Sequence, residues 1–322
     1  MDIKILSGDR FCDRNLLSVL KSLHLSSRTI KYLKYREDGL TVNGQKVTVR
    51  YVLRHGDTLS LAINDAVSAN CTPTDTELDV VFENEDIIVV NKPPFMPTHT
   101  SHGHYDDTLA NALVGYFGKK SIPFVFRPIN RLDRNTSGLV LVAKNKPAAS
   151  FLSSAMQNRE IKKSYIAVLE GKLPESQEKI KIGEEEFFVI DRHLHRTAES
   201  VIVREVCSPD APDAESAVTH YRILERSDRF TLVEAFPQTG RTHQLRVHFV
   251  HLGCPIVGDE LYGSPSQDIS RHALHARRLT LTLPNTPISG KIDRELITLT
   301  ATVPDDISAL IEKFFHQKGT DL

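Results

Sequence analysis

The most unusual stretch of this chain is Asn130-Arg-Leu-Asp-Arg-Asn-Thr-Ser-Gly138, continued by Leu-Val-Leu-Val-Ala-Lys144. Its first part is a polar loop in which Asp133 stands between two arginines, Arg131 and Arg134. Its second part is a short apolar run, typical of a strand buried on both faces. A carboxylate placed between two cations can act as a nucleophile or accept hydrogen bonds. A structural turn explains the same residues, because Asp, Asn and Gly favour turns.

The segments around this stretch mix strands and helices without a regular alternation. Strands are predicted over 78–82, 87–90, 138–144, 163–169 and 230–236, and helices after Pro147 and over 242–252. The turn at 84–86 pairs the first two strands, and Gly253 ends the second helix. This order predicts an α+β fold with a mixed, largely antiparallel sheet.

The N-terminal module, residues 1–64, is a separate basic segment. It holds eleven Lys and Arg against six Asp and Glu, although the net charge of the whole chain is −1. Residues 28–36 predict a helix capped by Ser26-Ser27, with Leu25, Ile30 and Leu33 facing inward. Its exposed side then carries Arg28, Lys31 and Lys34, which could follow an RNA backbone or form a solvated face.

A hairpin and a short strand follow this helix. Asn43-Gly44 predicts the hairpin turn, and residues 58–63 alternate as a strand. Leu25–Arg28, Gly39–Gly44 and Gly56–Leu59 make the module similar to the RNA-binding fold named after ribosomal protein S-four. Residues 65–77 are small and polar and predict a linker to a catalytic domain over 78–322.

A second polar stretch, Gln238–His248, contains Arg241, His243 and Arg246 where a glycine turn starts a helix. Helix N-termini and arginines both suit anions. The histidines lack companion ligands at metal-binding spacing, and no nucleotide-binding motif is present, so we expect neither metal nor cofactor.

The remaining composition bears on location. The four cysteines lie far apart and read as free thiols, no apolar run is long enough for a membrane span, and the N-terminus lacks a signal-peptide pattern. We therefore expect a cytoplasmic protein with no membrane partner.

Several spaced motifs resemble the RluA-type pseudouridine synthases. The match rests on Asn130–Lys144, Lys162–Ala167 and Thr239–Arg246, and extends to Val89–Pro93, Ala217–Tyr221, Gly253–Gly263 and Leu274–Ala276. It spans about residues 78–302 in the family's order. Together with the N-terminal module, the layout resembles members that carry an S-four-like domain ahead of the synthase domain.

The resemblance implies a role for each matched residue. Asp133 falls at the family's nucleophile, Tyr165 at the tyrosine that packs on the target base, and Arg246 at the arginine paired with the catalytic carboxylate. Arg131 falls where an arginine enters the RNA stack as the nucleotide leaves it. The reaction is the isomerisation of uridine to pseudouridine in RNA, with ribosomal RNA favoured over transfer RNA and a monomeric enzyme expected. Asn130 stands where the family usually has His, which weakens any acid–base role there.

Two observations bear on the alternatives. A catalytically idle RNA-binding protein on this scaffold would be expected to lose Asp133, Tyr165 or Arg246, and all three are present. An unrelated hydrolase would need a second carboxylate or a metal near Asp133. Bases outnumber acids by six over residues 126–163, whereas acids gather elsewhere, as at Glu184-Glu185-Glu186. We expect the RNA to bind the basic residues of this stretch, 126–163.

Overall fold

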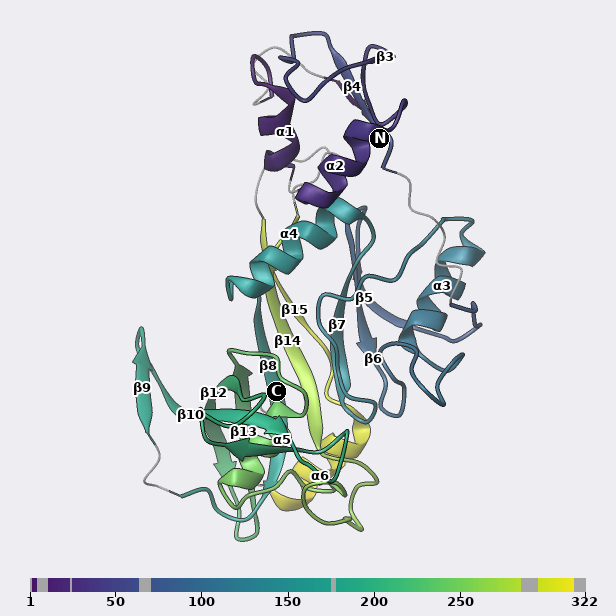
Figure 1. Ribbon diagram of the computed structural model, residues 1–322. Coiled ribbons are helices and arrows are strands. Elements are labelled where there is room, and N and C mark those ends of the chain that lie inside the picture. Colours follow the sequence, from purple (N-terminus) through teal and green to yellow (C-terminus); the bar gives the residue numbers. More distant parts are fainter. Residues whose placement is uncertain are drawn as a thin grey trace.

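The computed structural model describes residues 2–4, 11–23, 25–63, 71–174, 178–284 and 295–315. Residues 65–70 of the predicted linker and the end of the predicted catalytic domain, 316–322, lie outside this description. Within it, the strands form two separate sheets (Figure 1). Among these residues no helix combines the length and apolar character needed to cross a membrane.

The N-terminal module has its own small sheet and its own core. Its elements are β1 (Asp2–Lys4), α1 (Leu16–Ser22), α2 (Ser27–Tyr35), β2 (Leu40–Val42), β3 (Gln45–Lys46) and β4 (Thr58–Leu61). The sheet order is β1-β4-β2-β3, with every pair antiparallel. The buried residues of this core all come from between Phe11 and Leu61, so the module packs around itself.

Helix α2 forms as the sequence predicts. The Ser26 hydroxyl accepts a hydrogen bond from the backbone N–H of Thr29 at 3.1 Å, which satisfies one unpaired donor of the first turn. Ile30 and Leu33 are buried, and the opposite face exposes Arg28, Lys31 and Lys34. Two tyrosines of the same helix are also exposed, Tyr32 and Tyr35.

The second sheet carries the rest of the chain. Its strands are β5 (Asp79–Glu83), β6 (Ile87–Lys92), β7 (Ser137–Ala143), β8 (Lys162–Glu170), β9 (Lys179–Ile182), β10 (Glu185–Arg196), β11 (Arg204–Cys207), β12 (Glu215–Arg226), β13 (Phe230–Pro237), β14 (Leu274–Thr282) and β15 (Leu296–Thr300). The order is β11-β10-β12-β13-β8-β14-β7-β6-β5, with β15 paired to β14 and β9 to β10. Between described strands, β14 and β7 are parallel and all other pairs antiparallel. The predicted mixed, largely antiparallel α+β fold is confirmed.

Strand β7 lies between two apolar cores. Val140 and Val142 belong to one core, whereas Leu139, Leu141 and Ala143 belong to the other. Helix α3 (Leu109–Lys119) packs into the first core, and α4 (Lys146–Gln157) into the second. All seven residues of the strand are buried, as the sequence predicts. The two remaining helices are α5 (Gln244–His251) and α6 (Asp305–Phe314).

Gly138 lets β7 begin immediately after the Asp133 loop. Its φ of +114° is open to glycine and rarely to other residues, and an added Cβ atom would overlap the backbone of Ala276 in β14. The loop therefore enters the sheet at the point where β7 and β14 run in parallel. This contact fixes Asp133 relative to the centre of the sheet.

Candidate active site

A cavity of about 960 Å³ gathers the three sequence motifs on one side of the large sheet. Asp133 comes from the loop before β7, Tyr165 from β8 and Arg246 from α5, and all three line the cavity. Arg131 lines it too and is exposed. Arg28, Lys31 and Lys34 belong to α2 and are not among its lining residues. The structure thus brings together four of the seven predicted site residues.

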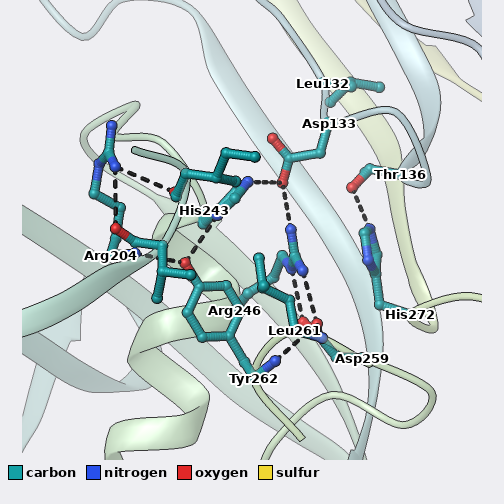
Figure 2. A network of polar contacts seen from close by, with 12 residues as sticks. Leu132, Asp133, Thr136, Arg204, His243, Arg246, Asp259, Leu261, Tyr262 and His272 are labelled. Carbon is teal, nitrogen blue, oxygen red and sulfur yellow. Dashed lines mark hydrogen bonds and ion pairs between the residues drawn. The ribbon is translucent and has the colours of Figure 1, made fainter. Parts of the chain in front are cut away.

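The Asp133 carboxylate has one occupied and one open oxygen. Oδ2 lies 3.4 Å from Arg246 Nη1 and 3.8 Å from His243 Nε2 (Figure 2). Among the described residues, no hydrogen bond or ion pair reaches Oδ1. The side chain is 25% exposed, so a ligand in the cavity can reach it. A carboxylate that keeps one oxygen free is arranged to attack or to accept a proton.

Arg246 is held in place by a second carboxylate. Its Nε and Nη2 atoms each lie 2.7 Å from an oxygen of Asp259, which leaves Nη1 to face Asp133. Both Arg246 and Asp259 are buried. The ion pair with Arg246 outweighs burial and lowers the pKa of Asp259, so this acid is ionised and fully engaged. In the sequence, Asp259 is only one residue of the matched stretch Gly253–Gly263, and its pairing with Arg246 appears only in the fold.

Asp259 also bears on the hydrolase alternative, which requires a second carboxylate near Asp133. That carboxylate exists, but both its oxygens are bonded to Arg246. It cannot serve as a partner acid unless that pairing breaks. Among the described residues, no group of three or more His, Cys, Asp or Glu side chains could hold a metal ion.

The loop around Asp133 is fixed on both sides of the carboxylate. The Thr98 hydroxyl donates to the carbonyl oxygen of Leu132 at 2.8 Å. The ammonium of Lys92 donates to the Arg134 carbonyl at 3.2 Å, and Arg271 Nη1 donates to the Asn135 carbonyl at 3.1 Å. Lys92 and Arg271 are themselves buried. Asp133 is therefore preorganised, since its neighbours are tied to other parts of the fold.

Tyr165 lies in β8 with its ring on the cavity wall. Burial, reinforced by the negative charge of Asp133, raises the pKa of its phenol. The side chain is therefore a neutral phenol at physiological pH. It can stack on a base and donate a hydrogen bond, whereas it can accept a proton only after giving up its own.

Helix α5 starts at Gln244, two residues later than predicted. The reason is His243, which adopts a left-handed conformation with φ 56° and ψ 17°. Its Nδ1 atom lies 2.8 Å from the hydroxyl of Tyr262, and that hydroxyl accepts the backbone N–H of Arg204 at 2.9 Å (Figure 2). Tyr262 also stacks beneath Arg246, with 4.9 Å between the guanidinium carbon and the ring centroid.

Asn130 and Glu185 also line the cavity. Asn130 uses its side-chain amide on β7, donating to the Leu139 carbonyl at 3.1 Å and accepting from Leu141 N–H at 2.8 Å. It therefore anchors the loop. Glu185 lines the cavity and pairs with Arg222 at 3.0 Å. The expectation that its acidic run lies apart from the site is wrong for this residue, because the β9–β10 turn brings it to the cavity edge.

The family model described as RNA pseudouridylate synthase matches residues 86–251, which is just over half of the chain and includes the three motifs that contain Asp133, Tyr165 and Arg246. The chain belongs to the RNA pseudouridylate synthase family. As a pseudouridine synthase it is an isomerase that acts on RNA, and its predicted resemblance to the RluA type is confirmed.

Individual relatives agree with this membership. The chain is 35% identical over 295 residues to the uncharacterized RNA pseudouridine synthase YjbO of Bacillus subtilis, covering 91% of this synthase and 97% of that one. It is 37% identical to ribosomal large subunit pseudouridine synthase D of Escherichia coli O6:H1, covering 78% and 76%. The structure of human RNA pseudouridylate synthase domain containing 1 has a TM-score of 0.53 and 25% identity, covering 74% of this chain and 95% of that chain.

Proposed function

We propose that this pseudouridine synthase converts uridines of ribosomal RNA to pseudouridine, with Asp133 as the nucleophile. The observation that carries the role of Asp133 is its carboxylate, which faces the cavity with Oδ1 open while Oδ2 is held beside Arg246. Ribosomal RNA is favoured because ribosomal large subunit pseudouridine synthase D of Escherichia coli O6:H1 is similar over most of its length.

The reaction requires the base to leave the RNA stack, detach from the sugar, rotate and rebond through carbon five. Tyr165 supplies the aromatic wall on which the base packs as it turns. Arg246 holds the carboxylate of Asp133 in place through the reaction. Arg131, which is exposed in the same loop as Asp133, takes the place of the base in the stack.

The cavity has a cationic side that suits the phosphates of the RNA. Arg159, Lys162 and Lys163 line it along with apolar side chains such as Phe187 and Phe236. Cations bind the backbone without reading sequence, whereas apolar walls accommodate the base. This mixture supports a site for a flipped nucleotide.

The N-terminal module, in this proposal, is an S-four-like RNA-binding domain. Its helix α2 offers Arg28, Lys31 and Lys34 to the RNA backbone, and the exposed ring of Tyr35 is available for stacking. Residues 65–77 join it to a catalytic domain over 78–322. We propose that the enzyme is a monomer and that it acts in the cytoplasm.

The test uses ribosomal and transfer RNA transcripts that carry tritium at carbon five of uracil. Rebonding at carbon five releases that tritium to water, so its release measures turnover. We expect release from large-subunit ribosomal RNA and little from transfer RNA. Release from transfer RNA alone would overturn the substrate assignment, and release from neither would contradict the proposed function.

A further inference from the structure

His243 is the residue immediately before α5, and its imidazole lies beside the carboxylate of Asp133. Its left-handed backbone, unusual for a non-glycine residue, turns the imidazole into the site, and its side chain makes no capping bond to the helix. Only 10% of that side chain is exposed. The fold thus maintains an unfavourable backbone conformation that places a titratable ring beside the nucleophile.

The hydrogen bonds around Tyr262 determine which nitrogen of His243 carries the proton. The phenol oxygen already accepts the N–H of Arg204 at 2.9 Å. Its own proton is then available for His243 Nδ1, 2.8 Å away. Because Nδ1 accepts that proton's hydrogen bond, a neutral imidazole carries its hydrogen on Nε2. That N–H faces Oδ2 of Asp133 at 3.8 Å.

Both rings stay in the protonation states that this arrangement needs. His243 faces the negative charges of Asp133 and Asp259 and the positive charges of Arg246 and Arg204. Burial has the largest effect and lowers the pKa of His243, so the imidazole is neutral at physiological pH. Burial also raises the pKa of Tyr262, so its hydroxyl keeps the proton that it donates.

We propose that His243 is a positioning residue whose Nε2–H, with Arg246, holds Oδ2 of Asp133 and directs Oδ1 toward the nucleotide, and that Tyr262 fixes its tautomer. This inference rests on the proposed role of Asp133. The present separation of 3.8 Å is about 0.9 Å longer than an N–H···O hydrogen bond. Contacts of this kind commonly shorten when the reacting complex forms.

Two substitutions separate this role from a purely structural one. In Gln, the amide nitrogen stands as many bonds from Cα as Nε2 does in His, so His243→Gln keeps a donor that reaches Asp133. In Asn, the amide stands where Nδ1 is, so His243→Asn keeps a partner for Tyr262 and falls short of Asp133. Asn tolerates the left-handed backbone better than Gln does. If His243 only shaped the start of α5, the Asn variant would therefore be the more active of the two.

Tritium release from large-subunit ribosomal RNA transcripts gives kcat and KM for each variant. We expect His243→Asn to lower kcat by about 10- to 100-fold with KM unchanged, and His243→Gln to stay within about 5-fold of the unaltered enzyme. An Asn variant as active as the Gln variant, or more active, would overturn the inference. An unaltered enzyme that releases no more tritium than Asp133→Asn would instead overturn the proposed function.

Tyr262→Phe supplies an independent arm, because the ring beneath Arg246 remains while the hydroxyl is lost. We expect it to lower kcat about 5-fold in the unaltered background, where the tautomer of His243 becomes free. In the His243→Gln background it should have no effect, since an amide has no tautomer to fix. Equal losses in both backgrounds would show that Tyr262 acts elsewhere, and would overturn its assigned role.

Discussion

At the residue scale, the central feature is a carboxylate whose two oxygens are used differently. Arg246 can contact Asp133 only because Asp259 holds the other two donors of the guanidinium. The fork shape of arginine is essential to this arrangement, since a lysine ammonium would be a single point charge. The position of the Asp133 carboxylate therefore depends on Asp259, a residue that it does not itself contact.

Arg246→Lys tests this dependence. We expect kcat to fall about 100-fold while the Kd for RNA changes less than about 3-fold, because lysine cannot pair with Asp259 at two points and still face Asp133. Tritium release and filter binding measure the two quantities. Arg226→Lys, at an exposed end of β12, is the matched control. Unchanged kcat in Arg246→Lys would contradict the role of the fork.

The sequence indicates the residues proposed to act in the reaction better than it indicates the contacts that support them. Asp133, Tyr165 and Arg246 stand within motifs of adjacent letters, and the structure brings them to one cavity. His243 lies in the matched stretch Thr239–Arg246, and Asp259 and Tyr262 lie in Gly253–Gly263, but the contacts between the two stretches appear only in the folded chain. Their local spacing gives no indication of which of them contact one another. Their roles follow from the fold and could not be derived before it.

At the element scale, the junction between β7 and β14 sets the position of the loop. Two buried histidines form hydrogen bonds at this junction. His272 Nε2 lies 2.7 Å from the Thr136 hydroxyl, and His275 Nδ1 lies 3.0 Å from the Ser137 hydroxyl. Apolar patterning predicts β7 over 138–144, whereas no strand is predicted for the residues of β14, and nothing in the sequence indicates the parallel pairing of the two strands. That pairing depends on Gly138, whose missing side chain permits the close approach.

This junction makes stability dependent on pH. Burial lowers the pKa of His272 to about 4 and that of His275 to about 4. Since an unfolded histidine has a pKa of about 6.5, the unfolded chain binds more protons between these values. Stability is therefore fully present above pH 6.5 and is lost as the pH falls toward 4. At pH 5 the loss is on the order of 1–2 kcal/mol for each histidine.

Urea unfolding at pH 7.5 and pH 5.0 measures this loss. We expect a lower midpoint at pH 5.0, and a smaller difference between the two pH values in His275→Gln, which cannot be protonated. The His275→Gln chain is compared only with itself, so any constant cost of the substitution cancels. Equal midpoints for the unaltered chain at both pH values would rule out these histidines as the acid-sensitive groups.

At the scale of the whole molecule, the two sheets belong to parts of the chain with different surfaces. The N-terminal module has a basic helix, whereas the larger sheet carries the cavity. The near-zero net charge of the chain hides this difference, because charge acts by location. The basic face of α2 was predictable from a spacing of three, since the capped helix formed where expected.

Replacing Arg28, Lys31 and Lys34 together with Ala tests the module. If these residues neutralise phosphates, RNA affinity falls and the slope of log K against log salt becomes shallower by about 2. The matched control removes three exposed cations elsewhere, Arg226, Arg229 and Lys313. Binding at several salt concentrations measures the slopes. The same slope as the unaltered enzyme would mean that this helix face is solvated and does not contact RNA.

The role of Asp133 is tested most directly by Asp133→Asn, which removes the proposed nucleophile and preserves the shape of the side chain. Turnover is measured as tritium release from uracil-labelled large-subunit ribosomal RNA, with RNA binding measured on the same preparation. The proposed role of Asp133 predicts that release falls by at least about 10³-fold while the Kd stays within about 3-fold. Tritium release at the rate of the unaltered enzyme would contradict it.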